Sequence, residues 1–487
     1  MVFMQKSVAN IFSRTIFRKL SLTILFIWVF FLSLLYSLLS ILRHNHFQSG
    51  GFDLGIYDQA IWQYAHFLIP YSTIKERLIL GDHLTLTLPL ISPLFYIWDN
   101  VRVLLIFQAF VISFSTIAIY KIALNRKLSS TASLLLSISY SLFYGIQFGV
   151  FFDFHPIILG VALLPWLAYF LETNKKKLFV TTLVLVLLTQ ENMGIAVSCI
   201  GLIYVFKKKY RGIAISIIVL GFVYMLVASK VVSFFSPVGY EYIPQIDKNP
   251  FHIILNYFNA PEKQQVWFYS LSSFLFLPVL SPGAILAVIL DLSQYFVTGQ
   301  TFARMWSPFM HHRAMLAPLL ALGTLDALML LRKKIKLELL CFVVLFSVLL
   351  QQYIFHFPLN KLTKKLYWQD ENWMKDDDKL LTIVPKNASV VTQQNLVSHL
   401  SHRKEIYLFW PRKNSNQAQK YCTHQNCWWL DFSGTPELLV VDRHPNQWVT
   451  QLLESNEHIE QALRNMEEAR KITIFTHVND AYIYNVY

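Results

Sequence analysis

Long apolar runs separated by short basic loops are the feature that most constrains this chain. A helix needs about 20 apolar residues to cross the hydrocarbon core of a bilayer, which is roughly 30 Å thick. About eleven apolar runs occur, several of them too short to cross alone, so we expect some broken or re-entrant segments. The sequence therefore predicts a mainly α, polytopic transmembrane helical bundle. The runs are Ser21–Leu42, Val101–Leu124, Thr131–Val150, Ile157–Leu171, Leu178–Thr189, Met193–Phe206, Gly212–Phe235, Val266–Leu280, Ala284–Val297, Ala314–Leu331 and Leu339–Phe355.

The composition agrees with membrane insertion. Of the 487 residues, 55% are hydrophobic and only 15% are charged, whereas an ordinary soluble chain carries about 25% charged residues. This excludes a soluble enzyme, a disordered protein and a disulfide-stapled mini-protein. The net charge of +13 suits a nucleic-acid surface at first sight. Much of the basic excess, however, lies in short loops between apolar runs, where it indicates membrane topology, so we expect no nucleic-acid partner.

The basic loops also predict the orientation. The first 20 residues contain basic side chains and no acidic one, which places the N-terminus in the cytoplasm. The first run is too long for a signal peptide and no cleavage site follows it, so we expect an uncleaved span. Alternating sides from this start puts every dense basic cluster in the cytoplasm. These clusters are Arg126/Lys127, Lys175–Lys177, Lys207–Arg211 and Arg332–Lys336.

From about residue 358 the chain becomes polar, which predicts two domains. We expect a transmembrane domain over 1–357, with a long first outer loop at 43–100, and a small extracytoplasmic α/β domain over 358–487. The helices expected in the second domain are Asn395–Ser401 and Asn456–Arg470. The expected strands are Leu380–Val384, Ser389–Thr392, Ile406–Phe409, Leu438–Val441 and a hairpin of Lys471–Thr476 with Ala481–Val486.

Two cysteines in the second domain, Cys422 and Cys427, are candidates for a disulfide because the extracytoplasmic side is oxidising. A zinc site that includes His424 is an alternative, although it lacks a fourth ligand. Free thiols are the other alternative.

Charged residues at the predicted outer side are the candidates for function. A charge near the hydrocarbon region is costly unless it is paired or hydrated. Each candidate also has a structural alternative, namely a helix cap, a tight turn, a solvated face or an interfacial anchor. The candidates are Asp53 and Asp58, Asp82 and His83, Asp153 and His155, Glu191, and the cations Lys230, Arg304, His311, His312 and Arg313.

Acids and cations that meet on one face of a membrane protein suit the transfer of a group from a phosphate-activated lipid. A carboxylate removes the proton of the acceptor, and cations or a metal stabilise the departing phosphate. Asp58, or else Asp53, is the expected catalytic base. Asp82, His83, Asp153, His155 and Glu191 are expected to bind or position substrate, and the cations to hold phosphate. Asp53, Asp58, Asp82 and His83 are also candidate ligands for Mg²⁺ or Mn²⁺, and the need for a cofactor stays open.

Several of these motifs resemble those of a family of polytopic membrane proteins from bacteria and archaea, domain-of-unknown-function family 2079. The resemblance is carried by Phe52-Asp53-Leu54-Gly55-Ile56-Tyr57-Asp58-Gln59, Gly81-Asp82-His83, Phe152-Asp153-Phe154-His155-Pro156, Gln190-Glu191-Asn192 (where Lys-Glu-Asp is expected), Lys230, His312 ahead of Ala317-Pro318, Ala388–Val391 and Asn395–Tyr407.

That family in turn resembles the GT-C membrane glycosyltransferases. This likeness implies a bacterial inner-membrane enzyme that takes a sugar from a polyprenyl-phosphate carrier and transfers it to a glycan, lipid or protein on the outer face. In those enzymes an aspartate of the first outer loop serves as base or metal ligand, and Asp53 or Asp58 occupies that place here. Two other functions remain open: a transporter or flippase of lipid-linked glycans, and a non-catalytic membrane scaffold.

Overall fold

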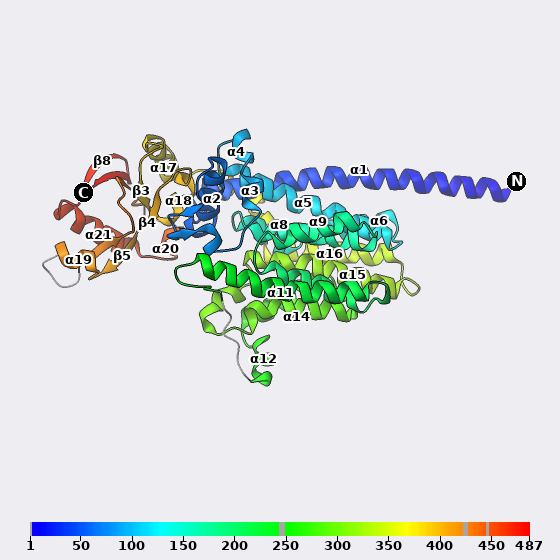
Figure 1. Ribbon diagram of the computed structural model, residues 1–487. Coiled ribbons are helices and arrows are strands. Elements are labelled where there is room, and N and C mark those ends of the chain that lie inside the picture. The colour runs from blue at the N-terminus through cyan, green and yellow to red at the C-terminus, as the bar shows by residue number, and fades with distance from the viewer. Residues whose placement is uncertain (1, 243–248, 422–426, 445–447) are drawn as a thin grey trace.

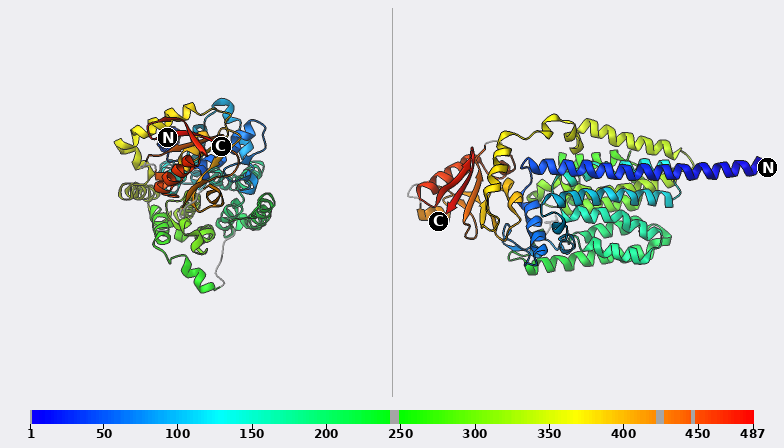
Figure 2. Two further views of the ribbon diagram at one scale, coloured as in Figure 1. Left: turned by 90° about the vertical axis from the view of Figure 1, so that its left-hand side faces the viewer. Right: turned by 90° about the horizontal axis from the view of Figure 1, so that it is seen from above.

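The computed structural model describes residues 2–242, 249–421, 427–444 and 448–487. A helix bundle occupies one end of the elongated molecule and a small sheet flanked by helices occupies the other (Figures 1 and 2). The expected fold class, a mainly α membrane bundle followed by a small C-terminal α/β region, is confirmed.

Each apolar run of the sequence forms a helix or a pair of helices. Within the described ranges, five helices are long and apolar enough to cross a membrane. The pair α6 and α7, bent by 44°, adds a sixth span if it is counted as one. Others, such as α8, α10 and α14, are apolar but short, as expected. The bundle contains α1 (Val2–Asn45), α5 (Arg102–Asn125), α6 (Ser130–Ser141), α7 (Tyr144–Phe151), α8 (Pro156–Glu172), α9 (Lys176–Leu187), α10 (Met193–Val205), α11 (Arg211–Phe235), α13 (Pro261–Ser273), α14 (Pro282–Phe296), α15 (Leu316–Leu331) and α16 (Leu337–Phe355).

The loop after α1 folds into short elements at the end of the bundle nearest the sheet. It begins with a π-helix, η1 (Gly51–Gly55), which continues directly into α2 (Ile56–Ala65). After it come β1 (Tyr71–Ser72), β2 (Arg77–Leu78), η2 (Ile79–Gly81), α3 (Leu88–Ile91) and α4 (Leu94–Ile97). Single π-helical turns are rare overall, but where they occur they are often at functional sites. The position of η1 therefore indicates that this part of the loop belongs to a functional site.

The C-terminal region is built on a five-stranded mixed sheet in the order β4-β3-β7-β9-β8. β3 runs parallel to β4 and β7, whereas β9 runs antiparallel to β7 and β8. Its strands are β3 (Val390–Thr392), β4 (Ile406–Leu408), β7 (Leu438–Asp442), β8 (Ile472–Val478) and β9 (Ala481–Val486), and its helices include α17 (Asn372–Ile383), α18 (Gln394–Leu400), α19 (Asn416–Tyr421), α20 (Trp448–Gln451) and α21 (Asn456–Glu468).

Most expected elements of this region are present, but one expected strand is wrong, and the short helices α19 and α20 and one strand pair were not expected. The strand expected at Leu380–Val384 is wrong, because α17 covers most of it. Trp373, Met374, Asp377 and Leu380 are buried at helical spacing on one face of α17. An additional antiparallel pair, β5 (Trp410–Lys413) with β6 (Trp428–Asp431), was not expected. The disulfide candidate includes Cys422, which lies outside the described residues.

One hydrophobic core joins the first loop to the C-terminal region. Leu54 and Ile61 pack in the same buried cluster as Val397 and Ile406. The contact is so close that a Cβ at Gly55 would lie 2.7 Å from Cγ1 of Val397, so glycine is required there. This core crosses the boundary expected between 1–357 and 358–487.

Buried and partly buried charges meet at the opposite end of the bundle. Arg126, after the last turn of α5, pairs with Glu172 of α8 and with Asp326 of α15, and Lys207 pairs with the same Asp326 at 2.7 Å. Tyr204 donates a hydrogen bond to Glu172. The basic clusters that follow α5 and α10 therefore lie at one end of the bundle, as alternation of the spans requires.

Candidate functional site

A cavity of about 600 Å³ lies where the bundle, the first loop and the C-terminal region meet. We call this end of the bundle the cavity end. Many of the residues singled out from the sequence line the cavity, although they come from segments far apart in the chain. These are Asp53, Asp82, His83, Asp153, His155, Glu191, Arg304, His311 and His312.

Asp53 is the carboxylate most open to the cavity. It lies in the π-helix η1, and its side chain is 36% exposed, while the side chains of Asp153 and Glu191 are at most 3% exposed. Nε2 of His155 lies 3.1 Å from Oδ1 of Asp53. Burial alone would raise the pKa of Asp53, but the hydrogen bond and charge of His155 hold that pKa below its ordinary value. Asp53 is therefore ionised at neutral pH and able to accept a proton.

The backbone around Asp53 is held from two sides. The amide of Gly50 donates to Oδ2 of Asp153 at 3.2 Å, and the amide of Gly51 donates to Oε1 of Gln394 at 3.0 Å. Asp153 also forms a buried ion pair with Arg43 at the end of α1. Burial raises the pKa of Asp153 to about 6, even though Arg43 acts in the opposite direction. Asp153 thus positions the turn that presents Asp53.

His83 and Glu191 form a second ionic pair in the cavity wall. Nδ1 of His83 lies 2.8 Å from Oε1 of Glu191, and the amide of Leu84 donates to Oε2 at 3.1 Å. Burial lowers the pKa of His83, but the charges of Glu191 and Asp82 outweigh it and raise the pKa to about 9. His83 is therefore a cation at neutral pH. Asp82 itself pairs with Lys75 at 3.5 Å.

Three histidine rings lie in contact beside Asp53: His155 and His311 are stacked, and His312 is tilted against His311. The ring centroids of His155 and His311 are 3.8 Å apart, and those of His311 and His312 are 3.9 Å apart. Within the described part of the chain, Nδ1 of each of the three rings is buried without a hydrogen-bond partner. With Arg304 nearby in the cavity lining, these rings offer donors to an anionic group.

Asp58 lies elsewhere, under the C-terminal region. Its side chain is fully buried, accepts a hydrogen bond from Oγ of Ser401, and lies 3.0 Å from Nε2 of His402. Nδ1 of His402 lies 2.7 Å from Asp99. Burial lowers the pKa of His402, but the adjacent carboxylates raise it to about 9. Asp58 therefore fastens α2 to the segment after α18 and does not line the cavity, contrary to its expected role as the base.

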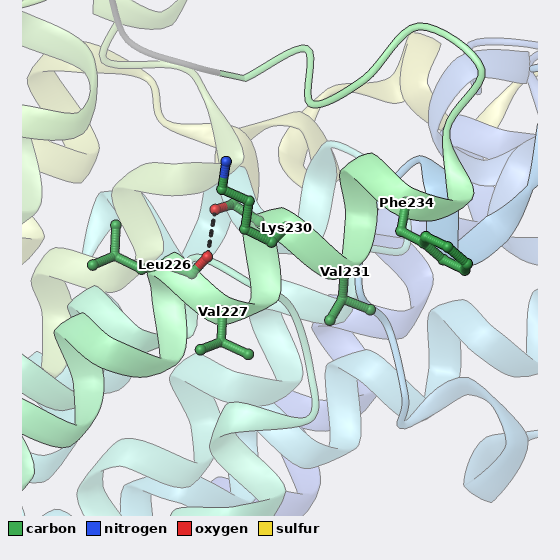
Figure 3. Close-up of a pocket in the computed structure, with 6 residues that line it drawn as sticks. Leu226, Val227, Lys230, Val231 and Phe234 are labelled. Atoms are coloured by element: carbon green, nitrogen blue, oxygen red, sulfur yellow. Dashed lines mark hydrogen bonds between the residues drawn. The ribbon is translucent and has the colours of Figure 1, made fainter.

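Two expected phosphate ligands also lie outside the cavity. Lys230 is on the exposed face of α11 among Leu226, Val227 and Phe234 (Figure 3). This placement fits a lysine that reaches from an apolar face toward the membrane surface. Arg313 is buried, and its guanidinium donates to the backbone carbonyls of Met305 and Ser307, so it supports the chain before α15.

The four expected metal ligands do not form one centre. Over the described residues, no group of three or more histidine, cysteine, aspartate or glutamate side chains is arranged to hold a metal ion. Asp53 instead contacts His155, Asp58 contacts His402, Asp82 contacts Lys75, and His83 contacts Glu191.

Several cavity residues were not expected from the sequence. Arg43 follows the first apolar run and resembles an interfacial anchor, so its pairing with Asp153 could not be foreseen. Tyr240 and Tyr242, in the loop after α11, donate to Glu191 and Asp82. Gln394 comes from the C-terminal region, and the only sequence signal was its position directly before the Asn395–Tyr407 motif.

Residues 43–468 match the model of a family described as "Predicted membrane protein (DUF2079)". No curated protein matches the chain. Among solved structures, the crystal structure of ArnT from Cupriavidus metallidurans bound to undecaprenyl phosphate is similar at 9% sequence identity, with a TM-score of 0.48. The match covers 94% of this chain and 97% of that chain.

Proposed function

The chain belongs to the DUF2079 family of predicted membrane proteins, and we propose that it is an integral membrane glycosyltransferase. The donor is a sugar on a polyprenyl phosphate, and the acceptor carries a hydroxyl group. The observation that carries this proposal is the meeting of an ionised, open carboxylate, Asp53, with a group of cationic and neutral nitrogen donors in one cavity at the end of the membrane helices.

The proposed reaction is a displacement at the anomeric carbon. The acceptor hydroxyl attacks this carbon, the bond from the carbon to the phosphate oxygen breaks, and polyprenyl phosphate leaves with the electron pair. Asp53 accepts the hydroxyl proton, and His155 holds the Asp53 carboxylate in place. Asp53, rather than Asp58, takes the role of base because it alone of the two lines the cavity.

The leaving phosphate needs positive charge or hydrogen-bond donors. His83, charged at neutral pH, and the group of Arg304, His311 and His312 supply them in the cavity lining. Apolar side chains in the same lining, including Phe302 and Met310, suit the first isoprene units of the lipid.

The cavity end is proposed to face the extracytoplasmic side of the membrane. The positive-inside rule supports this orientation, because Arg126 and Lys207 lie at the opposite end of the bundle. A bacterial inner membrane is the proposed location, in agreement with the use of polyprenyl carriers.

The test is transfer by the purified full-length protein in lipid nanodiscs. The donors are labelled undecaprenyl-phosphate hexoses and pentoses, and the acceptor probes are methyl glycosides, extracted membrane lipids and a serine- and threonine-containing peptide. Asp53→Asn should lower kcat about 10²- to 10⁴-fold, the usual contribution of a general base, without changing the melting temperature. Full activity of a folded Asp53→Asn protein would contradict the proposal.

A transporter gives a different result in a second assay. Movement of the intact donor across proteoliposomes, with no transfer in nanodiscs, would replace the glycosyltransferase by a lipid-linked glycan transporter. The distribution of charge opposes this alternative. The carboxylates of the cavity end and the ion network at the opposite end are separate groups, and the latter is internally paired.

A further inference from the structure

The C-terminal region supplies one wall of the cavity. Gln394 at the start of α18 and Val449 in α20 line it, together with Leu452 and Leu453 just after α20. Of these four side chains, only Gln394 can form a hydrogen bond. The C-terminal region therefore contributes a specific polar group to a site whose other polar groups come from the bundle and its loops.

Gln394 faces the turn that carries Asp53. Its side chain is 4% exposed, and its Oε1 accepts the hydrogen bond from the amide of Gly51, two residues before Asp53. A Cβ at Gly51 would lie 3.1 Å from this oxygen, so the contact is close as well as correctly oriented. Gln394 and Asp53 are both among the residues that line the cavity.

The contact with Gly51 fixes which end of the Gln394 amide is left without a partner. A backbone N–H is a donor only, so the atom of Gln394 that meets it must be the oxygen. The NH2 group is therefore the end left over. Among the described residues, Nε2 of Gln394 is buried and has no hydrogen-bond partner. A buried donor without an acceptor costs free energy, which a ligand oxygen would recover.

Phe52 completes the surroundings of Asp53. Its ring lines the cavity and stacks against Trp410, with centroids 5.6 Å apart and planes 16° apart. Nζ of Lys75 also lies 5.4 Å from the centroid of the Phe52 ring. A carboxylate, an amide donor and a partly exposed aromatic ring in the lining of one cavity suit a carbohydrate. The carboxylate and the amide bind neighbouring hydroxyl groups, and the ring covers the apolar C–H face of the sugar.

We propose that Gln394 binds the acceptor and that the acceptor is a sugar ring. Nε2 of Gln394 donates a hydrogen bond to a hydroxyl oxygen next to the hydroxyl that Asp53 deprotonates. This inference rests on the proposed glycosyltransferase function and adds the class of the acceptor. Gln394 is also the residue through which the C-terminal region positions the substrate.

The neighbouring residue provides a matched control. Gln393 is 1% exposed, its Oε1 accepts a hydrogen bond from the amide of Asp442, and its Nε2 also has no partner within the described ranges. It does not line the cavity. The two glutamines therefore share burial and one backbone contact, and they differ in access to the ligand.

The experiment compares Gln394→Glu, Gln394→Met and Gln393→Glu with wild type in the nanodisc transfer assay, using a methyl glycoside as acceptor probe. Gln394→Glu keeps an oxygen for Gly51 and removes the donor, whereas Gln394→Met removes both. Both Gln394 variants should raise the KM for the methyl glycoside about tenfold, the loss expected for one hydrogen bond. Gln393→Glu should leave this KM unchanged.

Binding of undecaprenyl phosphate, measured separately, shows whether the added charge of Gln394→Glu acts on the donor lipid. Gln394→Met adds no charge, so its KM effect must come from the lost amide. A purely structural role would give a normal KM in Gln394→Glu and a defect in Gln394→Met only, and this result would overturn the proposal. Transfer to the lipid or the peptide probe, but not to the methyl glycoside, would also overturn it.

Failure of the inference is distinguishable from failure of the proposed function. If wild type transfers sugar and both Gln394 variants keep the wild-type KM, the glycosyltransferase stands and the acceptor role of Gln394 is wrong. If wild type transfers no sugar from any donor to any probe, the proposed function falls, and the inference falls with it.

Discussion

The two ends of the helix bundle both contain buried or partly buried charges, but these charges have different surroundings at the two ends. At the end away from the sheet, the cations Arg126 and Lys207 pair with Glu172 and Asp326, and Ser281 donates a further hydrogen bond to Asp326. At the cavity end, Asp53 is 36% exposed. Over the described residues, the Nδ1 atoms of His311 and His312 there have no partner. The ion pairs at the first end hold helices together, whereas the open carboxylate at the cavity end is accessible to a ligand.

The largest effect is expected at the end away from the sheet. Asp326→Ala leaves two partly buried cations without their shared carboxylate, and it should lower the free energy of unfolding by about 2 to 3 kcal/mol, less than for a fully buried pair. Denaturant titration of the detergent-solubilised protein measures this change. The protein that remains folded should bind undecaprenyl phosphate with unchanged affinity. A loss of affinity at full stability would show that the two ends are coupled and would break the comparison.

The Asp58–His402 contact, which lies outside the cavity lining, should contribute to stability like the ion pairs at the end away from the sheet. The pKa of His402 is raised from 6.5 to about 9. Its contribution to stability is therefore complete below pH 6.5 and is lost as the pH rises to about 9. We expect a loss of about 2 kcal/mol over this interval, because His402 is partly exposed.

Melting temperatures between pH 6 and 9.5 test this expectation in wild type and in His402→Asn. The variant should be less stable at pH 6 and should lose less stability as the pH rises. A parallel pH dependence in both proteins would assign the effect to another group.

The charge of His83 tests whether the cavity end binds phosphate. Its pKa of about 9 means that its positive charge is present at neutral pH and disappears as the pH rises through 9. The Kd for undecaprenyl phosphate should therefore rise about tenfold, or 1.4 kcal/mol, between pH 7.5 and 10. Binding by His83→Asn should be weak and should vary less with pH, and His83→Lys should restore affinity at pH 7.5. Equal pH profiles in wild type and His83→Asn would exclude His83 as the phosphate ligand.

The smallest effect is expected at Lys230. This lysine is exposed on α11 and lines no part of the cavity. Lys230→Ala should change stability by less than about 0.5 kcal/mol, as is usual for surface substitutions, and should leave the Kd for undecaprenyl phosphate unchanged. Weakened phosphate binding in this variant would place the ligand on the outer face of α11.

The sequence predicted the helices better than the site. Apolar runs report burial in a membrane directly, so runs such as Val101–Leu124 and Gly212–Phe235 coincide with α5 and α11. The sequence also predicted that Asp53, Asp153 and Glu191 lie at one end of the bundle. Successive loops alternate between the two sides of the membrane, and the loops that carry these three residues fall on the same side.

Contacts between distant segments could not be predicted in this way. Asp53 and Asp58 lie in one motif with similar local sequence, yet one opens to the cavity and the other is covered by Ser401 and His402. The difference arises because the C-terminal region, about 340 residues later in the chain, packs over Asp58. A contact between such distant segments produces no periodic pattern in the sequence. Gln394 and Arg43 were missed for the same reason. The apolar run Leu380–Val384 alone predicts a strand, but the buried face of α17 begins at Trp373 and follows helical spacing.

The shared core of the first loop and the C-terminal region has a consequence for biosynthesis. Asp53 is made early, while Gln394, the group that holds its turn, follows the last membrane-spanning helix of the described chain. A nascent protein with every span already inserted still lacks one wall of the cavity. We therefore expect a chain that ends before Gln394 to lack the proposed transfer activity even when all of its spans are inserted.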